Sequence, residues 1–343
     1  MRTAALSGRA RVAVLAGGVL LLAGAATGYV LAGRGGPAPA VAPGAAPAAA
    51  PRAPGLPAGG LMYVGAGAAA GSGTVLAAPA GGTGVPRATG LSCRRFYAAA
   101  GTGLCLRVTP GLTTRAEAVV LDAGLREVRR VALPGIPSRA RLSADGRMAA
   151  WTFFVSGDSY LGVGFSTRAG VLDTRTGALV ADLEKFTLEK DGRPYRAVDV
   201  NYWGVTFAAD DNRFYATVST AGKTYLVQGD LAARRMRTLR ENAECPSLSP
   251  DGTRVVYKKR TGGDAAPWRL HVLDLRSGRE TALAEPANVD DQAVWLDGRT
   301  VGYARLRGDS SDVWAVPADG TGRPRLVLRD AYSPVPAPPA TGR

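Results

Sequence analysis

Three carboxylates in the C-terminal half of the chain could form a cation-binding or acid/base site. Glu244 precedes Asp290 by 46 residues, and Asp291 follows directly. The same offset separates two Asp-Gly turns at Asp251 and Asp297, so Glu244 and Asp290 take equivalent places in a repeat. Carboxylate oxygens are preferred ligands of Ca²⁺, and paired carboxylates can serve as acid and base. Two other interpretations stay open: an acidic cluster that binds a basic segment of a partner, and solvated loop residues.

A second group of candidates lies on two segments that are longer than their neighbours in the repeat. The first is an insertion at 153–168 that mixes aromatic, hydroxyl and carboxylate side chains, and the second is the connection 185–201. Long loops often carry function, although ordinary variation of surface loops gives the same pattern. The candidate binding residues are Asp158 and Asp199 from these segments, and Tyr202 and Trp203, which directly follow the second.

Motifs of known catalytic sites do not stand out in the chain. His271 is the single histidine, and no Cys-x-x-Cys pair occurs, so a Cys/His zinc site lacks ligands. His271 alternates with Leu270 and Val272, which is typical of a polar strand position. No nucleophile elbow, phosphate-binding loop or dinucleotide fingerprint stands out. We therefore predict no catalytic residue and no cofactor, with Ca²⁺ at the acidic cluster as the alternative.

The three cysteines predict one disulfide. Cys93 and Cys105 flank residues 98–103, which read as a hairpin turn. Positions near-symmetric about a hairpin face each other within disulfide reach. We predict the pair Cys93–Cys105, with Cys245 left over; pairing of Cys245 with either partner and three free thiols are the alternatives.

These candidates must be positioned by a repeated β element. A turn is followed by a short strand with an aromatic residue, and the step from glycine to aromatic is five residues at 146–151, 252–257 and 298–303. A degenerate copy leads to Tyr215. A second apolar strand then ends in Asp-x-x-x-Gly, as at Asp173 and Asp274. Asp-Gly suits tight turns, so these aspartates and glycines are expected to be structural.

The spacing of the repeat predicts an all-β, six-bladed β-propeller. Units of about forty residues with four strands each are typical of propeller blades. Residues 61–90 lack an inner strand, which residues 331–334 could supply by closing the ring. The predicted blades lie near 91–133, 139–190, 198–241, 245–285 and 290–330, with 61–90 as the sixth.

The combination of Ser-x-Asp-Gly, an aromatic strand and apolar-Asp-x-x-x-Gly resembles the repeat of the TolB-like (WD40-like) propeller family. The resemblance covers most of the chain after residue 60. It implies the six-bladed fold and a binding role, since propellers of this kind mostly bind other macromolecules. Propellers of six blades also include metal-dependent hydrolases and lactonases.

The N-terminus predicts export. Residues 12–32 carry no charge, and this run is long enough to cross a bilayer. Arg2, Arg9 and Arg11 precede it, and their positive charge favours an N-terminus on the cytoplasmic side. A cleaved signal peptide is the alternative. The expected organisation is a cytoplasmic segment at 1–11, a transmembrane signal anchor at 12–32, a Pro/Ala/Gly-rich linker or stalk at 33–60, the propeller at 61–336 and a disordered tail at 337–343.

The basic composition does not indicate a nucleic-acid partner. Net charge is +14, but only five of the 42 basic residues are lysines, a bias typical of a GC-rich, actinobacterial genome. No basic run with interleaved aromatic residues occurs, so nucleic acid is excluded as a partner. We expect a single-pass membrane protein with its propeller outside the cytoplasm, or a secreted one if the leader is cut. The favoured function is a non-catalytic scaffold for a protein or cell-wall/envelope polymer; a Ca²⁺-dependent hydrolase is the alternative.

Overall fold

The structure is a computed structural model that describes residues 60–67, 72–79, 84–111, 114–155 and 166–337. The predicted anchor, nearly all of the predicted stalk and the candidate Asp158 lie outside these residues. Within the described ranges, none of the helical segments has the length and apolar character that a membrane span requires. The repeat-containing part of the chain is thus the part that can be described.

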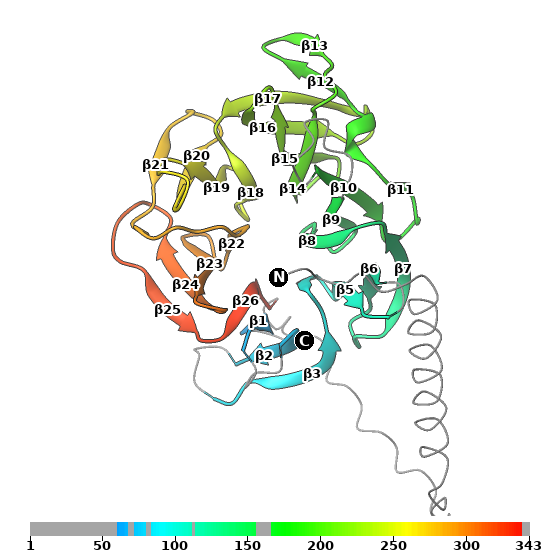
Figure 1. Ribbon diagram of the computed structural model, residues 1–343, viewed down its shortest axis with the longest axis vertical. Coiled ribbons are helices and arrows are strands. Elements are labelled where there is room, and N and C mark those ends of the chain that lie inside the picture. Colours follow the sequence, from blue (N-terminus) through cyan, green and yellow to red (C-terminus); the bar gives the residue numbers. More distant parts are fainter. Residues whose placement is uncertain (1–59, 68–71, 80–83, 112–113, 156–165, 338–343) are drawn as a thin grey trace, which may run out of the picture. The chain divides into compact units, whose positions relative to one another are not determined.

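Six β-sheets lie radially around a common centre, which confirms the predicted all-β, six-bladed propeller (Figure 1). From the centre outward, blade 1 contains β26 (Ala331–Pro336), β1 (Leu61–Gly65), β2 (Thr74–Ala78) and β3 (Arg87–Ser92). Blade 2 contains β4 (Arg95–Ala99), β5 (Thr102–Thr109), β6 (Arg115–Leu121) and β7 (Glu127–Leu133). Blade 3 contains β8 (Ile136–Leu142), β9 (Met148–Val155), β10 (Ser166–Asp173) and β11 (Leu179–Val180).

The second half of the ring follows the same order with one addition. Blade 4 contains β14 (Asn201–Phe207), β15 (Arg213–Thr220), β16 (Lys223–Asp230), β17 (Arg235–Glu241), β12 (Thr187–Lys190) and β13 (Arg193–Tyr195). Blade 5 contains β18 (Glu244–Leu248), β19 (Arg254–Arg260), β20 (Trp268–Asp274) and β21 (Glu280–Ala282). Blade 6 contains β22 (Val294–Trp295), β23 (Thr300–Arg307), β24 (Ser310–Pro317) and β25 (Arg325–Leu328).

The ring closes through a strand from the end of the chain, as the sequence predicts. β26 pairs antiparallel with β1, so that Ala331 lies opposite Gly65 and Val335 opposite Met62. Blade 1 therefore combines an inner strand from the C-terminal end with three strands from the start of the propeller (Figure 1). This pairing satisfies an edge of β1 that would otherwise offer free backbone groups to another chain.

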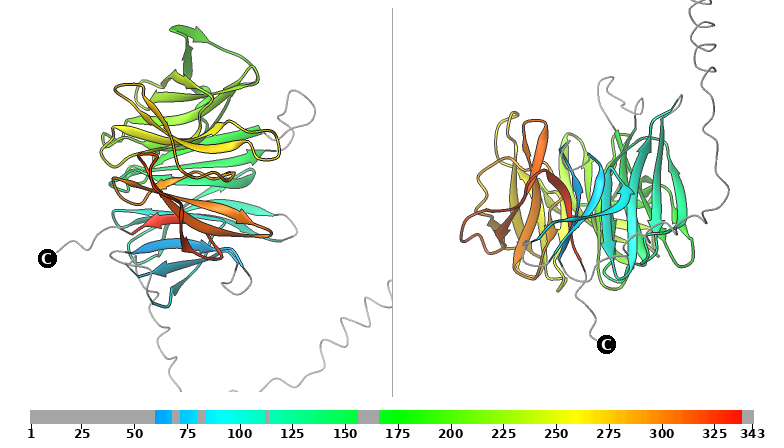
Figure 2. Two further views of the ribbon diagram at one scale, coloured as in Figure 1. Left: turned by 90° about the vertical axis from the view of Figure 1, so that its left-hand side faces the viewer. Right: turned by 90° about the horizontal axis from the view of Figure 1, so that it is seen from below.

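The apolar faces of the blades are buried against neighbouring blades. Leu104 and Leu106 of β5 form one buried cluster with Trp151 and Phe153 of β9. The sheets lie face to face around the ring (Figure 2). Because a single four-stranded sheet cannot bury both of its faces alone, the core consists of these interfaces between blades.

The fourth blade departs from two sequence predictions. The segment 185–201 is not a plain loop, since β12 and β13 form a hairpin in which β12 pairs in parallel with β17. The predicted blade 139–190 was therefore too long, because β12 belongs to the next blade. A parallel pair between distant segments depends on where the chain folds back, which local spacing does not encode.

The aromatic position of the fourth blade is also shifted. Phe214 and Val255 each pair with the last residue of their inner strands, β14 and β18. Phe214 of β15 and Val255 of β19 are therefore equivalent positions. Two residues after them come Ala216 and Tyr257, so the structural counterpart of Tyr257 is Ala216 and not Tyr215. Tyr215 instead packs in the core cluster that contains Tyr257.

The repeated aspartates have the structural role that the sequence predicts. In the β8–β9 turn, the hydroxyl of Ser143 donates to Asp145 at 2.7 Å and accepts from the N–H of Met148 at 2.9 Å. In the β18–β19 turn, Ser249 makes the same two bonds, to Asp251 and from the N–H of Arg254. The Ser-x-Asp-Gly motif thus replaces water as the partner of turn backbone groups.

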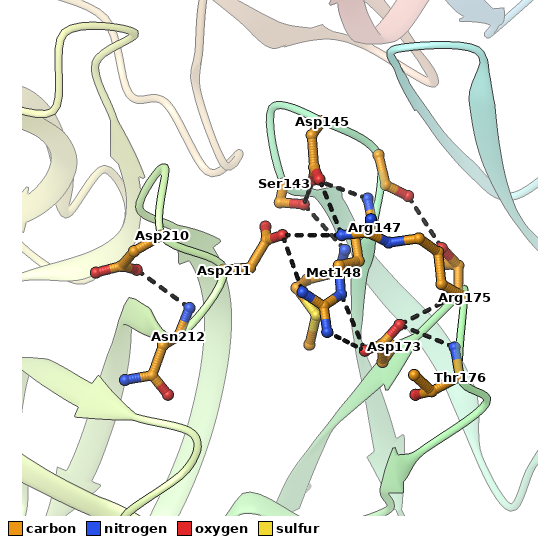
Figure 3. Close-up of polar contacts among 12 residues, drawn as sticks. Ser143, Asp145, Arg147, Met148, Asp173, Arg175, Thr176, Asp210, Asp211 and Asn212 are labelled. Carbon is orange, nitrogen blue, oxygen red and sulfur yellow. Dashed lines mark hydrogen bonds and ion pairs between the residues drawn. The ribbon is translucent and has the colours of Figure 1, made fainter.

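Asp173 joins two such turns within blade 3 (Figure 3). Arg147 donates to one oxygen of Asp173 from Nε at 3.0 Å and from Nη2 at 2.8 Å, and the N–H groups of Arg175 and Thr176 donate to the other. Burial alone would raise the pKa of Asp173, but hydrogen bonds from Arg147, Thr176 and Arg175 lower it to about 2.

Substitution of Asp173 by asparagine is expected to destabilise the propeller in a pH-dependent way. The pKa falls from 3.8 in the unfolded chain to about 2 in the folded chain, so the stabilisation is present above about pH 4 and is lost as the pH falls through 2. We expect a loss of about 2 kcal/mol at pH 7 that shrinks toward pH 2 in urea unfolding curves. Asp191→Asn, at an exposed position, is the control, and a loss that does not change with pH would contradict the assignment.

The predicted disulfide is present, and it joins two blades. Cys93 and Cys105 are bonded with their Cα atoms 5.4 Å apart, and Cys245 is a buried free thiol. Cys105 of β5 lies opposite Phe96, so Cys93 lies outside the hairpin ladder. The Cys93 N–H donates to Gly73 O in blade 1. The bond therefore links the end of blade 1 to β5 of blade 2.

Replacement of both cysteines by serine is expected to cost about 2–3 kcal/mol, because the bond closes a short loop in the unfolded chain. The measurement is urea unfolding of the double variant beside the wild type under non-reducing conditions. Cys245→Ser serves as a control for loss of a thiol without loss of a disulfide. Equal unfolding midpoints for the double variant and the wild type would show that the link carries no stability.

Candidate functional site

The candidate site is a cavity of about 530 Å³ at one end of the central channel, which we call the mouth cavity. Its walls include the first residues of three inner strands, Arg95 of β4, Asn201 of β14 and Glu244 of β18, together with Arg139 in the middle of β8. These strands lie nearest the centre of the ring (Figure 1). Because the inner strands of all blades run in the same sense, their first residues converge on one face of the propeller.

The mouth cavity is basic, whereas the sequence predicted an acidic cluster at Glu244, Asp290 and Asp291. Its charged lining residues are Arg94, Arg95, Arg139, Lys258, Glu244 and Asp290. A second cavity of about 440 Å³ shares the two adjacent arginines and Asp290, and adds Asp291 and Asp309. Sequence reasoning found the carboxylates and missed the cations, since the cations come from three other strands and meet the carboxylates only after folding.

Lys258 is the buried cation of this site. Its side chain is 4% exposed, and its ammonium group donates a hydrogen bond to Asp290, whose side chain is 54% exposed. The ammonium also lies 4.5 Å from the ring centre of Trp268. Burial would raise the pKa of Asp290, but the charges of Lys258, Arg139 and Arg95 outweigh it and hold the pKa below its usual value. Asp290 therefore remains ionised beside Lys258.

The position equivalent to Lys258 is a threonine in each of the two preceding blades. Thr152, Thr217 and Lys258 lie opposite mouth residues of their inner strands, namely Arg139, Trp203 and Glu244. Both threonines accept a backbone N–H of the following blade. A charged residue in a buried strand was the signal in the sequence that could have identified Lys258.

Three arginine side chains line the opposite wall, and some of their N–H groups make no hydrogen bond within the ranges that the structure describes. Arg95 donates from Nε to Ser138 O at 2.6 Å, and Arg94 from Nε to Pro137 O at 3.2 Å. Among the described residues, no hydrogen bond from their terminal amines is present. Arg139 donates from Nη1 to Ser138, while its buried Nε lacks a hydrogen-bond partner in the described part of the chain. The terminal amines of Arg94 and Arg95 can therefore still donate to a ligand.

Glu244 and Asp291 lie beside the cations in different ways. Glu244 is buried, and burial raises the pKa of its carboxyl against the opposing charge of Lys258. Asp291 is buried and accepts the N–H of Ala304 at 3.2 Å, so one of its oxygens is used within blade 6. In the described residues, no group of three or more His, Cys, Asp or Glu side chains could hold a metal ion.

The remaining candidates from the sequence are dispersed. Trp203 lines the mouth cavity with Glu244 and Asp290. Tyr202, only 1% exposed, points instead into the core of blades 3 and 4, because neighbouring strand residues face opposite sides. Asp199 accepts from the Thr220 hydroxyl and the Ala221 N–H, which makes it a turn residue. Asp158 lies outside the described residues.

The fold and site define a six-bladed β-propeller with a polar mouth, and comparisons with known proteins agree with this class. No protein-family model and no curated protein sequence matches the chain. Among solved structures, TolB from Acinetobacter baumannii is 17% identical over 82% of this chain and 67% of that chain, with a TM-score of 0.58. At this level of identity the likeness to TolB is one of fold.

Two other solved structures are similar with lower TM-scores. A chain of a nidogen/laminin complex is 12% identical over 81% of this chain and 97% of that chain, with a TM-score of 0.53. A puromycin-hydrolyzing peptidase from Mycobacterium tuberculosis is 16% identical, with a TM-score of 0.47; the match covers 75% of this chain and 42% of the peptidase. A propeller fold by itself assigns neither a binding nor an enzymatic role, because propellers have many functions.

Proposed function

We propose that this chain is a membrane-anchored, extracytoplasmic TolB-like propeller that binds a protein partner through its mouth face and performs no catalysis itself. The observation that carries the proposal is the combination of a polar cavity with exposed apolar side chains at its edge. Ile136, Phe154 and Leu306 are 49%, 38% and 78% exposed. Phe154 lines the mouth cavity and pairs with Ile136, and Leu306 lines the adjoining cavity. Apolar residues gathered on one face are typical of protein-binding surfaces.

Two further observations support export. The uncharged run at 12–32 preceded by arginines predicts an anchor whose C-terminal side is outside the cytoplasm. The Cys93–Cys105 disulfide suits an oxidising compartment. A protein partner also fits the likeness to a chain of a nidogen/laminin complex. An envelope polymer as the partner is an outcome that the experiments below can distinguish.

Site-specific photo-crosslinking in intact cells tests the proposed surface. A photoreactive amino acid at Ile136 is expected to give one discrete protein adduct, which mass spectrometry identifies. The same amino acid at Val128, which is exposed on the outermost strand of blade 2, is the matched control. Adducts of equal yield and identity at both positions would contradict a mouth-specific interface, and a diffuse polysaccharide adduct would indicate an envelope polymer.

Thiol labelling tests the location. Because Cys245 is buried and the other two cysteines are bonded, a Val128→Cys variant has one accessible thiol among the described residues. A membrane-impermeant maleimide is expected to label this variant in intact cells. Labelling that occurs only after lysis would place the propeller inside the cell and overturn the proposal.

A further inference from the structure

We propose that the mouth cavity is a carboxylate-binding site, in which an acidic segment of the protein partner replaces Asp290 on Lys258. The inference rests on the proposed function and adds the chemical class of the ligand. In the absence of the partner, Asp290 binds the Lys258 ammonium group in place of the ligand carboxylate.

Lys258 and Asp290 differ in solvent exposure, as expected for an ion pair in which one partner can be exchanged. The lysine side chain is 4% exposed, so its ammonium group needs a fixed anionic partner. Asp290 is 54% exposed and lies in the segment between β21 and β22, outside the strands. A carboxylate that enters the mouth cavity can therefore take its place without moving a strand, and Asp290 can turn toward water.

The opposite wall supplies further donors for the same ligand. The terminal amines of Arg94 and Arg95 have no hydrogen-bond partner among the described residues, so they can donate to a ligand. Arg139 lies 3.9 Å from the Asp290 carboxylate, and burial, followed by the neighbouring charge of Arg139, lowers the pKa of Arg95. An anion between them relieves this repulsion, and guanidinium groups bind carboxylates with paired hydrogen bonds.

The surroundings of the cavity favour an acidic peptide over an acidic polysaccharide. Lys258 and Arg260 lie 4.5 and 4.8 Å from the ring centre of Trp268, so this ring is already in contact with two cations and is less open to stacking with a sugar. Ile136 and Leu306 offer apolar contact at the edge of the cavities. A segment with alternating acidic and apolar side chains matches both features.

The inference is tested with a defined probe, a fluorescein-labelled peptide of sequence Glu-Glu-Leu-Glu-Glu-Leu, and the purified full chain in detergent. Fluorescence anisotropy is expected to show binding that weakens with salt, and the Gln-for-Glu peptide is expected to bind at least about tenfold more weakly. Asp290→Asn removes the competing occupant, so it is expected to tighten binding by about five- to tenfold. Asp191→Asn, which also removes an aspartate paired with a lysine, is expected to change nothing.

Lys258→Met is expected to weaken peptide binding by at least about tenfold, and Lys185→Met, at an exposed position, is the control. Since loss of a buried lysine could impair folding, melting is recorded for each variant, and Lys258→Arg is expected to retain binding. Unchanged or weaker binding by Asp290→Asn would overturn the exchange of carboxylates. Tighter binding of a polygalacturonate oligomer than of the peptide would overturn the choice of a peptide ligand. A crosslink at Ile136 without peptide binding would refute this inference while the proposed function stands.

Discussion

Removal of residues 331–343 is expected to unfold the propeller or to convert it into an aggregate. The truncation deletes β26, whose Ala331 and Val335 are fully buried, and exposes the inner edge of β1. It also removes a contact between blades, since the hydroxyl of Ser333 donates to Phe96 O at 2.9 Å. We expect a loss of about 5 kcal/mol or more, because a whole core strand and its pairing disappear.

The measurement is the melting temperature by circular dichroism together with size-exclusion chromatography. A shorter truncation that removes only residues 338–343 leaves β26 intact and is expected to melt like the wild type. If the longer truncation remained monomeric with an unchanged melting temperature, the prediction that ring closure by β26 stabilises the propeller would be wrong.

Substitution of Gly229 by alanine is expected to destabilise the protein by about 2–3 kcal/mol through overpacking. Gly229 of β16 lies opposite Phe214 of β15, and an added Cβ would meet the phenyl ring at 2.1 Å. Phe214 is fully buried and contacts Phe186 edge-on, with ring centres 6.2 Å apart, so the ring has little room to move. The expected result is a lower urea midpoint with an unchanged slope.

The control for this substitution is Gly298→Ala, because nothing lies within 4 Å of the added Cβ at that turn and its backbone does not need glycine. A double variant Gly229→Ala/Phe214→Leu isolates the clash. Its loss of stability is expected to be smaller than the sum of the two single losses, since the smaller side chain gives space to the new methyl group. Additive losses would mean that the phenyl ring is not the cause.

Much of the fold could be predicted from the sequence because its signals are local. The Ser-x-Asp-Gly turns satisfy their own backbone through Ser143 and Ser249, so each turn is specified by a few adjacent residues. The closing strand at 331–334 could be predicted because the first blade lacked an inner strand. The hairpin of β12 and β13 could not, because its parallel pairing joins Leu188 to Met236, far along the chain.

The site shows the same division at the level of side chains. The sequence indicated that Glu244 and Asp290 take equivalent places in the repeat and offered Trp203 as a separate candidate, and all three line the mouth cavity. It could not indicate which direction Tyr202 faces, because a shift of one residue along a strand exchanges core and surface. Nor could it indicate the sign of the charge at the mouth.

The sequence by itself determined the class of fold, the closure of the ring and the Cys93–Cys105 bond, because each depends on turns, strand patterns or one short spacing. Only the tertiary structure decided the chemistry of the mouth. There Lys258 of β19 meets Asp290 from the next blade, with Arg139 from blade 3 at 3.9 Å from the same carboxylate. Electrostatic interactions act through space, so charges from separate blades combine only when the ring brings them within a few ångströms.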